Sequence, residues 1–335
     1  MNHSKSPLRW RGLATAALAV GLLAGCMQVA DLTAVKAERA KPISRTDSFQ
    51  SASSNGKVLV AGTASSAILS SPDGGKTWSR HALASPSSIT ALTACADGSF
   101  VGVDFYRKVW IGDASGAQWS AQPTVKGFDA LAVTCDPSGR IWLAGSRSTL
   151  LSSADKGKTW KATDFGEDLL LTTIQFIDAE HGLVTGEFGT ALATADGGAT
   201  WQPLPKMPNE FYPYATLFTD RQNGWSSGLA GVILHTTDGG KTWAPQTNES
   251  KLPMYSLLRQ GSVLYGLGAG GQMVALQGDT WSRFNHGLNV PAYLSAGAVL
   301  DAQSVLVVGP AGALHVVKAT DRVALAAAKT QEVTP

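Results

Sequence analysis

The sequence predicts an all-β protein, a seven-bladed β-propeller of four-stranded blades. A short sequence motif, S/T-x-D-x-G-x-T-W, occurs four times, and two incomplete copies also occur. The tryptophans that end the six copies stand at 78, 119, 160, 201, 243 and 281. A period of about 41 residues that persists over most of a chain indicates a repeat array. Four short strands in about 40 residues form the unit of a propeller blade.

The repeated phrase is the Asp box, expected where the third and fourth strands of a blade reverse. Its carboxylate can accept backbone N–H groups inside the turn, and its glycine supplies a positive φ. The tryptophan then begins the outer strand and is expected to pack between neighbouring sheets. Because every blade needs the same turn, we interpret the boxes as structural, and we expect no metal or cofactor. The complete copies contain Asp73 and Trp78, Asp155 and Trp160, Asp196 and Trp201, and Asp238 and Trp243.

Short apolar runs supply the other strands of each repeat. Residues 58–62 and 141–145 are rich in Val, Leu, Ile and Ala, end in glycine and are bounded by turn residues, which is typical of strands. A last repeat without a box follows at 298–318. The ring could be closed by 44–50 or by 322–325, either of which could complete a shared blade and protect its sheet edges.

The N-terminus has the features of an export signal. Lys5, Arg9 and Arg11 precede an apolar run at 13–23, which is too short for a membrane span, and Leu-Ala-Gly-Cys follows, ending at Cys26. These four residues resemble the lipobox of bacterial lipoproteins, in which the cysteine is lipidated and becomes the first mature residue. The alternative is an ordinary secretory signal with an incidental Cys26. Met27, where Asp would retain a lipoprotein in the inner membrane, favours an outer-membrane lipoprotein facing the periplasm.

The predicted organisation has four parts. Residues 1–25 form the lipoprotein signal peptide, 26–48 the lipidated cysteine and a tether, 49–320 the propeller, and 321–335 a closing strand or disordered tail. Removing the signal deletes three basic and no acidic residues, leaving 24 Lys and Arg against 25 Asp and Glu. This balance gives no support for nucleic-acid binding, which usually shows as a basic excess. We expect a monomer attached to the membrane by its N-terminal lipid.

Two cysteines remain after lipidation, Cys95 and Cys135. Their separation of 40 residues, almost one repeat, places them near the same point on the innermost strands of adjacent blades. A bridge requires Cα atoms within about 7 Å of each other. Counted from the glycines at 98 and 139, however, the two positions are offset by one residue, which can turn their side chains apart. A disulfide formed in an oxidising periplasm and two buried thiols both remain open.

The candidate binding face lies opposite the Asp boxes. Turns between the second and third strands project there, and so does the connection after Trp201. Exposed aromatic and Arg side chains on loops are common anchors for protein partners. The alternative is that the tyrosines only cover the mouth of the central channel. The candidate residues are Phe105, Tyr106, Arg107, Lys108, Arg147, Glu187, Phe188, Phe211, Tyr212 and Tyr214.

An export signal followed by Asp-box (BNR) blades resembles the bacterial propellers of the photosystem II stability and assembly factor family. The resemblance covers residues 50–318 and rests on the D-G-G-K-T-W phrase with a short strand before it. It implies a non-enzymatic chaperone for membrane complexes. We therefore expect a lipid-anchored scaffold or assembly factor for a cell-envelope complex, with a protein partner.

The alternatives are a sialidase-like glycoside hydrolase, whose propeller also carries Asp boxes, and a sugar- or peptide-binding propeller. The resemblance to sialidases would imply three arginines gripping a carboxylate, a Tyr and Glu pair, an Asp acid and an early Arg-Ile-Pro phrase. That phrase is missing from this sequence, and Arg140 and Arg221 are expected on the Asp-box side. Because a fold alone does not supply function, we expect no catalytic residues.

Overall fold

The computed structural model describes Met1 and residues 31–39 and 41–318 of the chain. The chain divides between Lys41 and Pro42 into two compact units. The first contains one short helix, α2 (Thr33–Arg39). No helix in the described residues is long and apolar enough to cross a membrane. Residues 2–25 of the predicted signal, the predicted lipidation site Cys26, and the segment 321–335 lie outside the described residues.

The second unit is built of antiparallel meanders in which each strand pairs with the next along the chain. The first three meanders contain β1 (Phe49–Ser54), β2 (Leu59–Thr63), β3 (Ala67–Ser71), β4 (Ser79–Ala82), β5 (Ile89–Ala94), β6 (Phe100–Asp104), β7 (Lys108–Gly112), β8 (Trp119–Pro123), β9 (Ala130–Cys135), β10 (Ile141–Gly145), β11 (Thr149–Ser153) and β12 (Lys161–Asp164). The later ones contain β13 (Leu171–Phe176), β14 (Gly182–Gly186), β15 (Ala191–Thr194), β16 (Gln202–Pro203), β17 (Pro213–Phe218), β18 (Gly224–Gly228), β19 (Ile233–Thr236), β20 (Ala244–Asn248), β21 (Met254–Gln260), β22 (Val263–Gly268), β23 (Met273–Gln277), β24 (Thr280–Arg283), β25 (Ala296–Val299), β26 (Ser304–Val308) and β27 (Leu314–Lys318).

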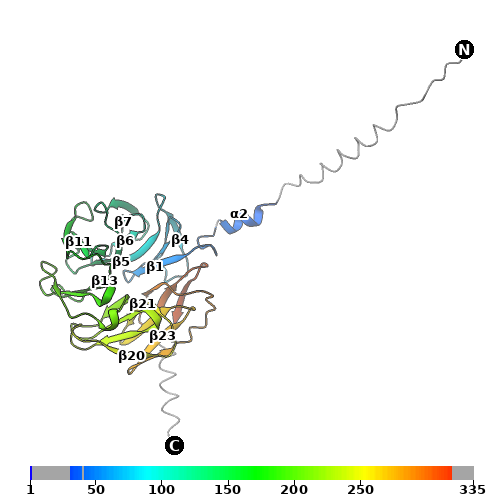
Figure 1. The fold of residues 1–335 in the computed structure, drawn as a ribbon. Coiled ribbons are helices and arrows are strands. Elements are labelled where there is room, and N and C mark those ends of the chain that lie inside the picture. The colour runs from blue at the N-terminus through cyan, green and yellow to red at the C-terminus, as the bar shows by residue number, and fades with distance from the viewer. Residues whose placement is uncertain (2–30, 40, 319–335) are drawn as a thin grey trace, which may run out of the picture. The chain divides into compact units, whose positions relative to one another are not determined.

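These meanders stand around a common centre, as in a β-propeller (Figure 1). The innermost strands β1, β5, β9, β13, β17, β21 and β25 contact one another in chain order, and β25 also contacts β1. The β17–β20 and β21–β24 meanders form one eight-stranded sheet because β20 pairs with β24 in parallel. The last sheet, β25–β27, has three strands within the described residues.

The ring closes through hydrogen bonds between the start of β1 and the last sheet. The Phe49 N–H donates to the carbonyl of Gly309 at 3.2 Å, and the Gly312 N–H donates to the carbonyl of Asp47 at 2.8 Å. The Asp47 carboxylate in turn accepts two hydrogen bonds from the guanidinium of Arg80 in β4. Of the two segments considered for closure, 44–50 overlaps the start of β1, the innermost strand of the first sheet, and 322–325 lies outside the described residues.

The Asp-box carboxylates hold the turns between the third and fourth strands. In all four complete boxes the Asp accepts the backbone N–H of the following Thr at 2.9 Å and its hydroxyl at 2.6 Å. The box glycine before the Thr has a φ between 79° and 86°. Hydrogen bonds from the Thr lower the pKa of each box Asp to about 2. The incomplete copy that ends at Trp119 keeps part of this arrangement, since Asp113 accepts the N–H groups of Ala117 and Gln118.

The Asp-box tryptophans pack between adjacent sheets. Trp78 packs against Leu306 of β26, in the last sheet, and Trp119 against Val60 of β2. Trp201 is 7% exposed and meets Trp142 of β10 edge to face, with ring centroids 5.8 Å apart. Trp281 at the shortened last box is fully buried. These four tryptophans therefore join their own meander to the preceding one, whereas Trp243 packs on Phe218 of its own meander and on the connection before it.

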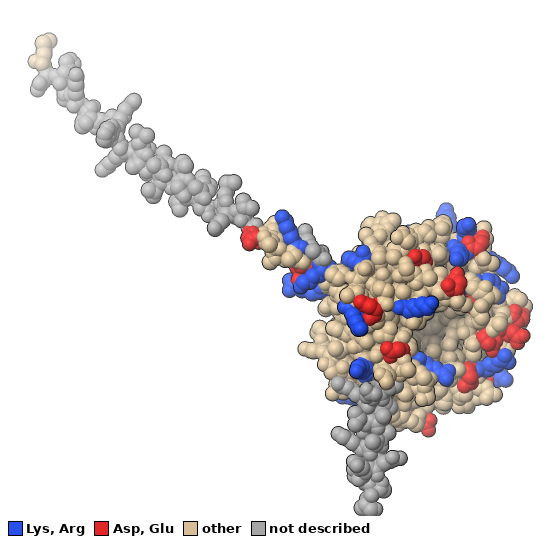
Figure 2. Space-filling model, turned by 180° about the vertical axis from the view of Figure 1, so that it is seen from behind, with Lys and Arg blue, Asp and Glu red and all other residues tan. Residues whose placement is uncertain are grey.

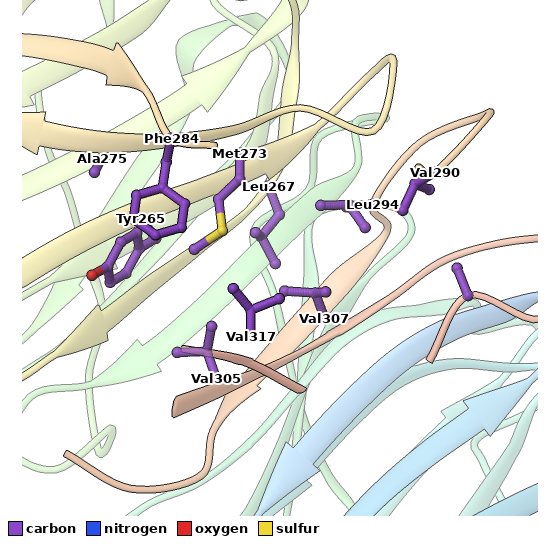
Figure 3. Close-up of a cluster of buried hydrophobic side chains, with 11 residues drawn as sticks. Tyr265, Leu267, Met273, Ala275, Phe284, Val290, Leu294, Val305, Val307 and Val317 are labelled. Atoms are coloured by element: carbon purple, nitrogen blue, oxygen red, sulfur yellow. The ribbon is translucent and has the colours of Figure 1, made fainter. Parts of the chain in front are cut away.

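The core lies between the sheets rather than in a single centre. Figure 3 shows one such layer, in which Tyr265 and Met273 of the β21–β24 meander point toward Val305 and Val317 of the last sheet. The Tyr265 ring also packs edge to face on Phe284. Because each layer is formed by two neighbouring meanders, no meander can bury its apolar faces alone.

A disulfide joins Cys95, which follows β5, to Cys135 at the end of β9, with Cα atoms 5.2 Å apart. Both cysteines lie in the apolar layer between these two meanders, beside Val101 and Ile141. The one-residue offset counted from the turn glycines does not separate them. The bridge links neighbouring innermost strands across the ring wall.

Replacing a sheet-bridging tryptophan should weaken the whole ring. We expect Trp201→Ala to lower the free energy of unfolding by about 3–5 kcal/mol, because it removes a buried indole from a layer that cannot collapse fully. Urea denaturation followed by circular dichroism measures the change. Tyr293→Ala, at a ring 41% exposed, is the matched control. A loss below about 1 kcal/mol for Trp201→Ala would contradict this packing role.

Acid should destabilise the protein through the Asp boxes. The folded-state pKa of these carboxyls, about 2, is below the ordinary value of 3.8, so their contribution to stability is complete above about pH 5 and is lost as the pH falls from 4 toward 2. Thermal unfolding between pH 2 and 7 tests this. In the double variant Asp73→Asn with Asp155→Asn, the melting temperature should fall less steeply as the pH is lowered from 4 to 2. An equally steep fall of the melting temperature in the double variant would show that other groups control stability at acid pH.

Removing the disulfide should also lower stability. We expect Cys95→Ala with Cys135→Ala to decrease the free energy of unfolding by about 2–4 kcal/mol, because the bridge restricts the unfolded chain. Denaturation with and without dithiothreitol measures it: the reductant should destabilise the natural protein and leave the double variant unchanged. A natural protein that is insensitive to reductant after unfolding and refolding would show that the bridge does not form.

Candidate functional site

The two faces of the ring differ in chemistry. We call the end with the turns between third and fourth strands the Asp-box face, and the opposite end, with the turns between second and third strands and the connections between meanders, the upper face. Of the large apolar side chains exposed on the described part of the second unit, all but Val316 lie at the upper face. They are Phe105, Tyr106, Val125, Leu131, Phe188, Leu229, Val232, Leu252 and Tyr293.

Charged and amide side chains on the Asp-box face connect neighbouring meanders. The Arg221 guanidinium binds Asp178 at 2.8 Å, and hydrogen bonds from His181 and this arginine hold the pKa of Asp178 well below its usual range. Arg140 binds Asp136 at 2.8 Å and the carbonyl of Gly197 in the next box. Figure 2 shows one face of the molecule, with basic side chains beside acidic ones around a hollow. Charges paired in this way hold neighbouring turns of the ring together.

At the upper face, β-bulges direct side chains into the central channel. In each innermost strand from β1 to β21, one residue near the start has no partner on the second strand, and the register shifts by one. A bulge of this kind changes the direction of a side chain, and such bulges are frequent next to functional sites. The bulged residues are Gln50, Thr90, Leu131, Thr172, Tyr214 and Tyr255. All of them line one cavity of about 330 Å³, which we call the channel mouth.

The channel mouth is lined by uncharged residues only. Part of its polar lining is tied into the wall: the Thr172 hydroxyl donates to the carbonyl of Pro213 at 2.9 Å, and the Gln50 side-chain carbonyl accepts the Ser88 hydroxyl at 2.8 Å. Hydroxyls of Thr173, Thr185, Thr216 and Ser226 form a chain with separations of 2.6, 2.9 and 2.8 Å. The mouth therefore offers hydroxyl and aromatic groups and no fixed charge.

Four tyrosines form a row across one side of this mouth, which we call the tyrosine row. Ring centroids are 5.7 Å apart for Tyr212 and Tyr214, 5.3 Å for Tyr214 and Tyr255, and 5.7 Å for Tyr255 and Tyr293, and each pair meets edge to face. Burial raises the pKa of Tyr212 and Tyr214, with Glu187 adding to the effect at Tyr212. These two hydroxyls therefore stay protonated at neutral pH.

A second cavity, of about 440 Å³, adjoins the mouth and shares Thr90 and Leu131 with it. Phe105 and Tyr106, 73% and 48% exposed, meet edge to face at its wall. The Arg107 guanidinium binds both carboxylate oxygens of Asp129, at 2.5 and 3.2 Å, and this hydrogen bonding raises the pKa of Arg107. We call this cavity the Phe105 pocket.

The other predicted site residues lie outside the linings of these two cavities. Arg147 is exposed and donates to the carbonyl of Gly127 at 3.1 Å, and Phe188 is exposed at its turn. The Glu187 carboxylate accepts the Leu170 N–H at 2.8 Å. Lys108 donates to the carbonyl of Pro86, and its amine lies 5.3 Å from the Trp110 ring, which gives it a structural role.

The assignment of Phe211 to the binding face is wrong. Its side chain is 7% exposed and packs against Met207 and Leu234, because the connection before β17 folds back onto the sheet. Sequence reasoning also missed Leu131, Tyr255 and Tyr293. Tyr255 carried a usable signal, since it lies one repeat of 41 residues after Tyr214.

The arginines considered for a hydrolase do not converge. Arg107 binds Asp129 at the upper face, whereas Arg140 and Arg221 bind carboxylates at the Asp-box face. Arg147 reaches a backbone carbonyl rather than the Phe105 pocket. These four guanidinium groups therefore do not form the three-arginine grip on a carboxylate that a sialidase uses.

Residues 162–260 match the family described as Photosynthesis system II assembly factor YCF48. Among curated proteins, the chain is similar to a photosystem II assembly lipoprotein Ycf48 from Synechococcus sp. (strain CC9902), with 31% identity over 42% of this chain and 44% of that protein. A Ycf48 from Prochlorococcus marinus (strain NATL2A) is 36% identical over 21% of this chain and 23% of that protein. The chain thus spans less than half the length of these relatives. The resemblance seen in the sequence is confirmed.

Solved structures share the fold. A structure described as YCF48 bound to D1 peptide superposes with a TM-score of 0.68 at 15% identity, covering 84% of this chain and 94% of that one. A streptogramin B lyase superposes with a TM-score of 0.71 at 12% identity, covering 82% and 95%. One of these neighbours is a lyase and the other a peptide-binding factor, so the shared fold does not decide between enzyme and binding protein.

Proposed function

We propose that this protein is a non-catalytic, lipid-anchored β-propeller of seven blades that binds a protein partner as a scaffold or assembly factor for a membrane complex. The observation that carries the proposal is the concentration of exposed apolar side chains at one face. Contiguous exposed apolar surface marks interaction sites. All but one of the exposed large apolar side chains of the described second unit lie at this face, so we assign the binding role to it.

The similar proteins support a polypeptide ligand. The curated relatives are named as assembly lipoproteins, and one solved neighbour of the same fold is described with a bound D1 peptide. In this chain the channel mouth and the Phe105 pocket adjoin each other through Thr90 and Leu131. Together they offer a continuous path across the upper face for an extended segment of a partner.

The entry of the chain into the ring supports the membrane role. Asp47 lies just before β1 and accepts a hydrogen bond from Gly312, in the turn of the last sheet at the upper face. A tether from a lipidated Cys26 would therefore hold the upper face toward the bilayer that carries the anchor. We place the protein at the periplasmic side of the outer membrane of a bacterial cell.

A sugar-binding propeller is the second candidate. The observation that favours it is the combination of tyrosine rings with a lining of hydroxyl groups at the channel mouth. The hydrolase receives less support, because the arginines that it would need are bound elsewhere in the ring.

The proposal is tested by crosslinking and affinity purification from cells. We expect the natural protein to recover one membrane complex, and Phe105→Ala with Tyr106→Ala to lose at least about tenfold of it, because exposed aromatic anchors carry much of the binding energy. The matched control is Val316→Ala, an exposed apolar residue away from the upper face, which should recover the same complex. Equal recovery by all three proteins, or no specific complex, would contradict the scaffold role and favour a glycan screen.

A further inference from the structure

We propose that the tyrosine row binds an extended, uncharged, proline-containing segment of the partner in the polyproline II conformation. The inference rests on the proposed function and names the chemistry of the segment that the upper face would hold. It assigns the row Tyr212, Tyr214, Tyr255 and Tyr293 a role separate from that of the Phe105 pocket. Three features of the structure carry it: a preformed aromatic surface, an uncharged channel mouth beside it, and unused hydroxyl groups.

The tyrosine rings are fixed before any ligand arrives. Tyr214 and Tyr255 are the bulged residues of β17 and β21, so the sheet itself aims them. Tyr293 is held by an antiparallel bridge to Ala269 and by the Leu294 N–H, which donates to the carbonyl of Gly268 at 2.9 Å. Edge-to-face contacts then lock each ring against the next. A preorganised surface loses little conformational entropy on binding.

On its channel side the row meets no charge that could pair with a ligand, and the exposed charged residues Arg45, Glu210 and Lys251 stand in the connections before β1, β17 and β21. The nearby turns read Leu-Ala-Gly at 229–231, Ala-Gly-Gly at 269–271 and Pro-Ala-Gly at 310–312. The channel mouth below is uncharged throughout. The Glu187 carboxylate, whose charge acts on Tyr212, already accepts the Leu170 N–H. Desolvating a charged side chain without a partner is costly, so the favoured segment is neutral.

The hydroxyl groups of the row complete the argument. No hydrogen bond joins any of these four hydroxyls to another described residue, and each can donate one. A polyproline II segment has no internal hydrogen bonds, so its carbonyls are available to accept. Grooves lined by aromatic rings dock such segments because the conformation costs little entropy. Rings that meet edge to face leave notches between them, which suit proline side chains better than the flat face of a sugar.

The test measures binding of a defined probe to the full-length lipoprotein in detergent. A short fluorescent peptide that repeats Ala-Pro-Pro is titrated by anisotropy beside two probes of equal length, one repeating Ala-Gly-Ser and one repeating Glu-Pro-Pro. We expect the Ala-Pro-Pro probe to bind at least about tenfold more tightly than either. Equal affinity for the three probes, or preference for the acidic one, would overturn the proposal.

Variants locate the binding. Tyr255→Ala with Tyr293→Ala should weaken the Ala-Pro-Pro probe at least about tenfold, and Tyr255→Phe with Tyr293→Phe by less, because only the hydroxyls are lost. Val316→Ala, at an exposed apolar residue away from the upper face, is the control and should bind the probe as the natural protein does. Undiminished binding by the Tyr→Ala pair, in a protein with unchanged circular dichroism, would contradict the inference. Tighter binding of maltoheptaose than of the peptide, lost in the same variant, would assign the row to a sugar.

The inference and the function on which it rests fail separately. If the Ala-Pro-Pro probe does not bind but the crosslinked complex still depends on Phe105 and Tyr106, the scaffold role stands and the assignment of the row falls. If the probe binds through the row but no membrane complex is recovered, the row keeps its ligand class and the scaffold role is contradicted.

Discussion

The rest of this structure depends on one hydrogen-bonded turn, the reversal held by the Asp-box carboxylate. Each carboxylate binds the backbone and hydroxyl of the same threonine, which fixes where the fourth strand begins. The tryptophan that follows is thereby placed at the edge of its sheet and reaches the preceding meander. Such tryptophans occur in the layers on both sides of most meanders, although the layer between β21–β24 and the last sheet is formed without one. A local turn thus helps to determine how neighbouring sheets pack, and repetition of the turn produces the ring.

The upper face follows from the same sheets by a second local feature. The extra residue near the start of each innermost strand from β1 to β21 lines the channel mouth, so the mouth is assembled from equivalent positions in successive meanders. Nothing in the turns of the Asp-box face constrains these residues. They can therefore differ from sheet to sheet, as Gln50, Leu131 and Tyr255 do, while the ring stays the same. The fold and the site are thus determined by different residues.

The sequence predicts the repeat, its strands and the separation of the two faces, because spacing and turn residues report local structure directly. The bulges could not be predicted, since a one-residue shift in register depends on which backbone groups pair. Phe211 and Tyr212 show the same limit: of these adjacent aromatic residues the first is buried and the second half-buried, and only the fold of the connection decides this. The tyrosine row joins residues from different repeats, so pattern within one repeat does not reveal it.

The parallel pairing of β20 with β24 has a mechanical consequence. Two meanders that elsewhere would only pack against each other share backbone hydrogen bonds at their outer edge, and the Gln246 amide binds the indoles of both Trp225 and Trp281. We therefore expect these two meanders to move together as one rigid part of the ring. Tyr214 and Tyr255 are carried on the inner strands of these two meanders, so we expect the spacing of their rings to vary less than that of side chains on sheets that share no hydrogen bonds.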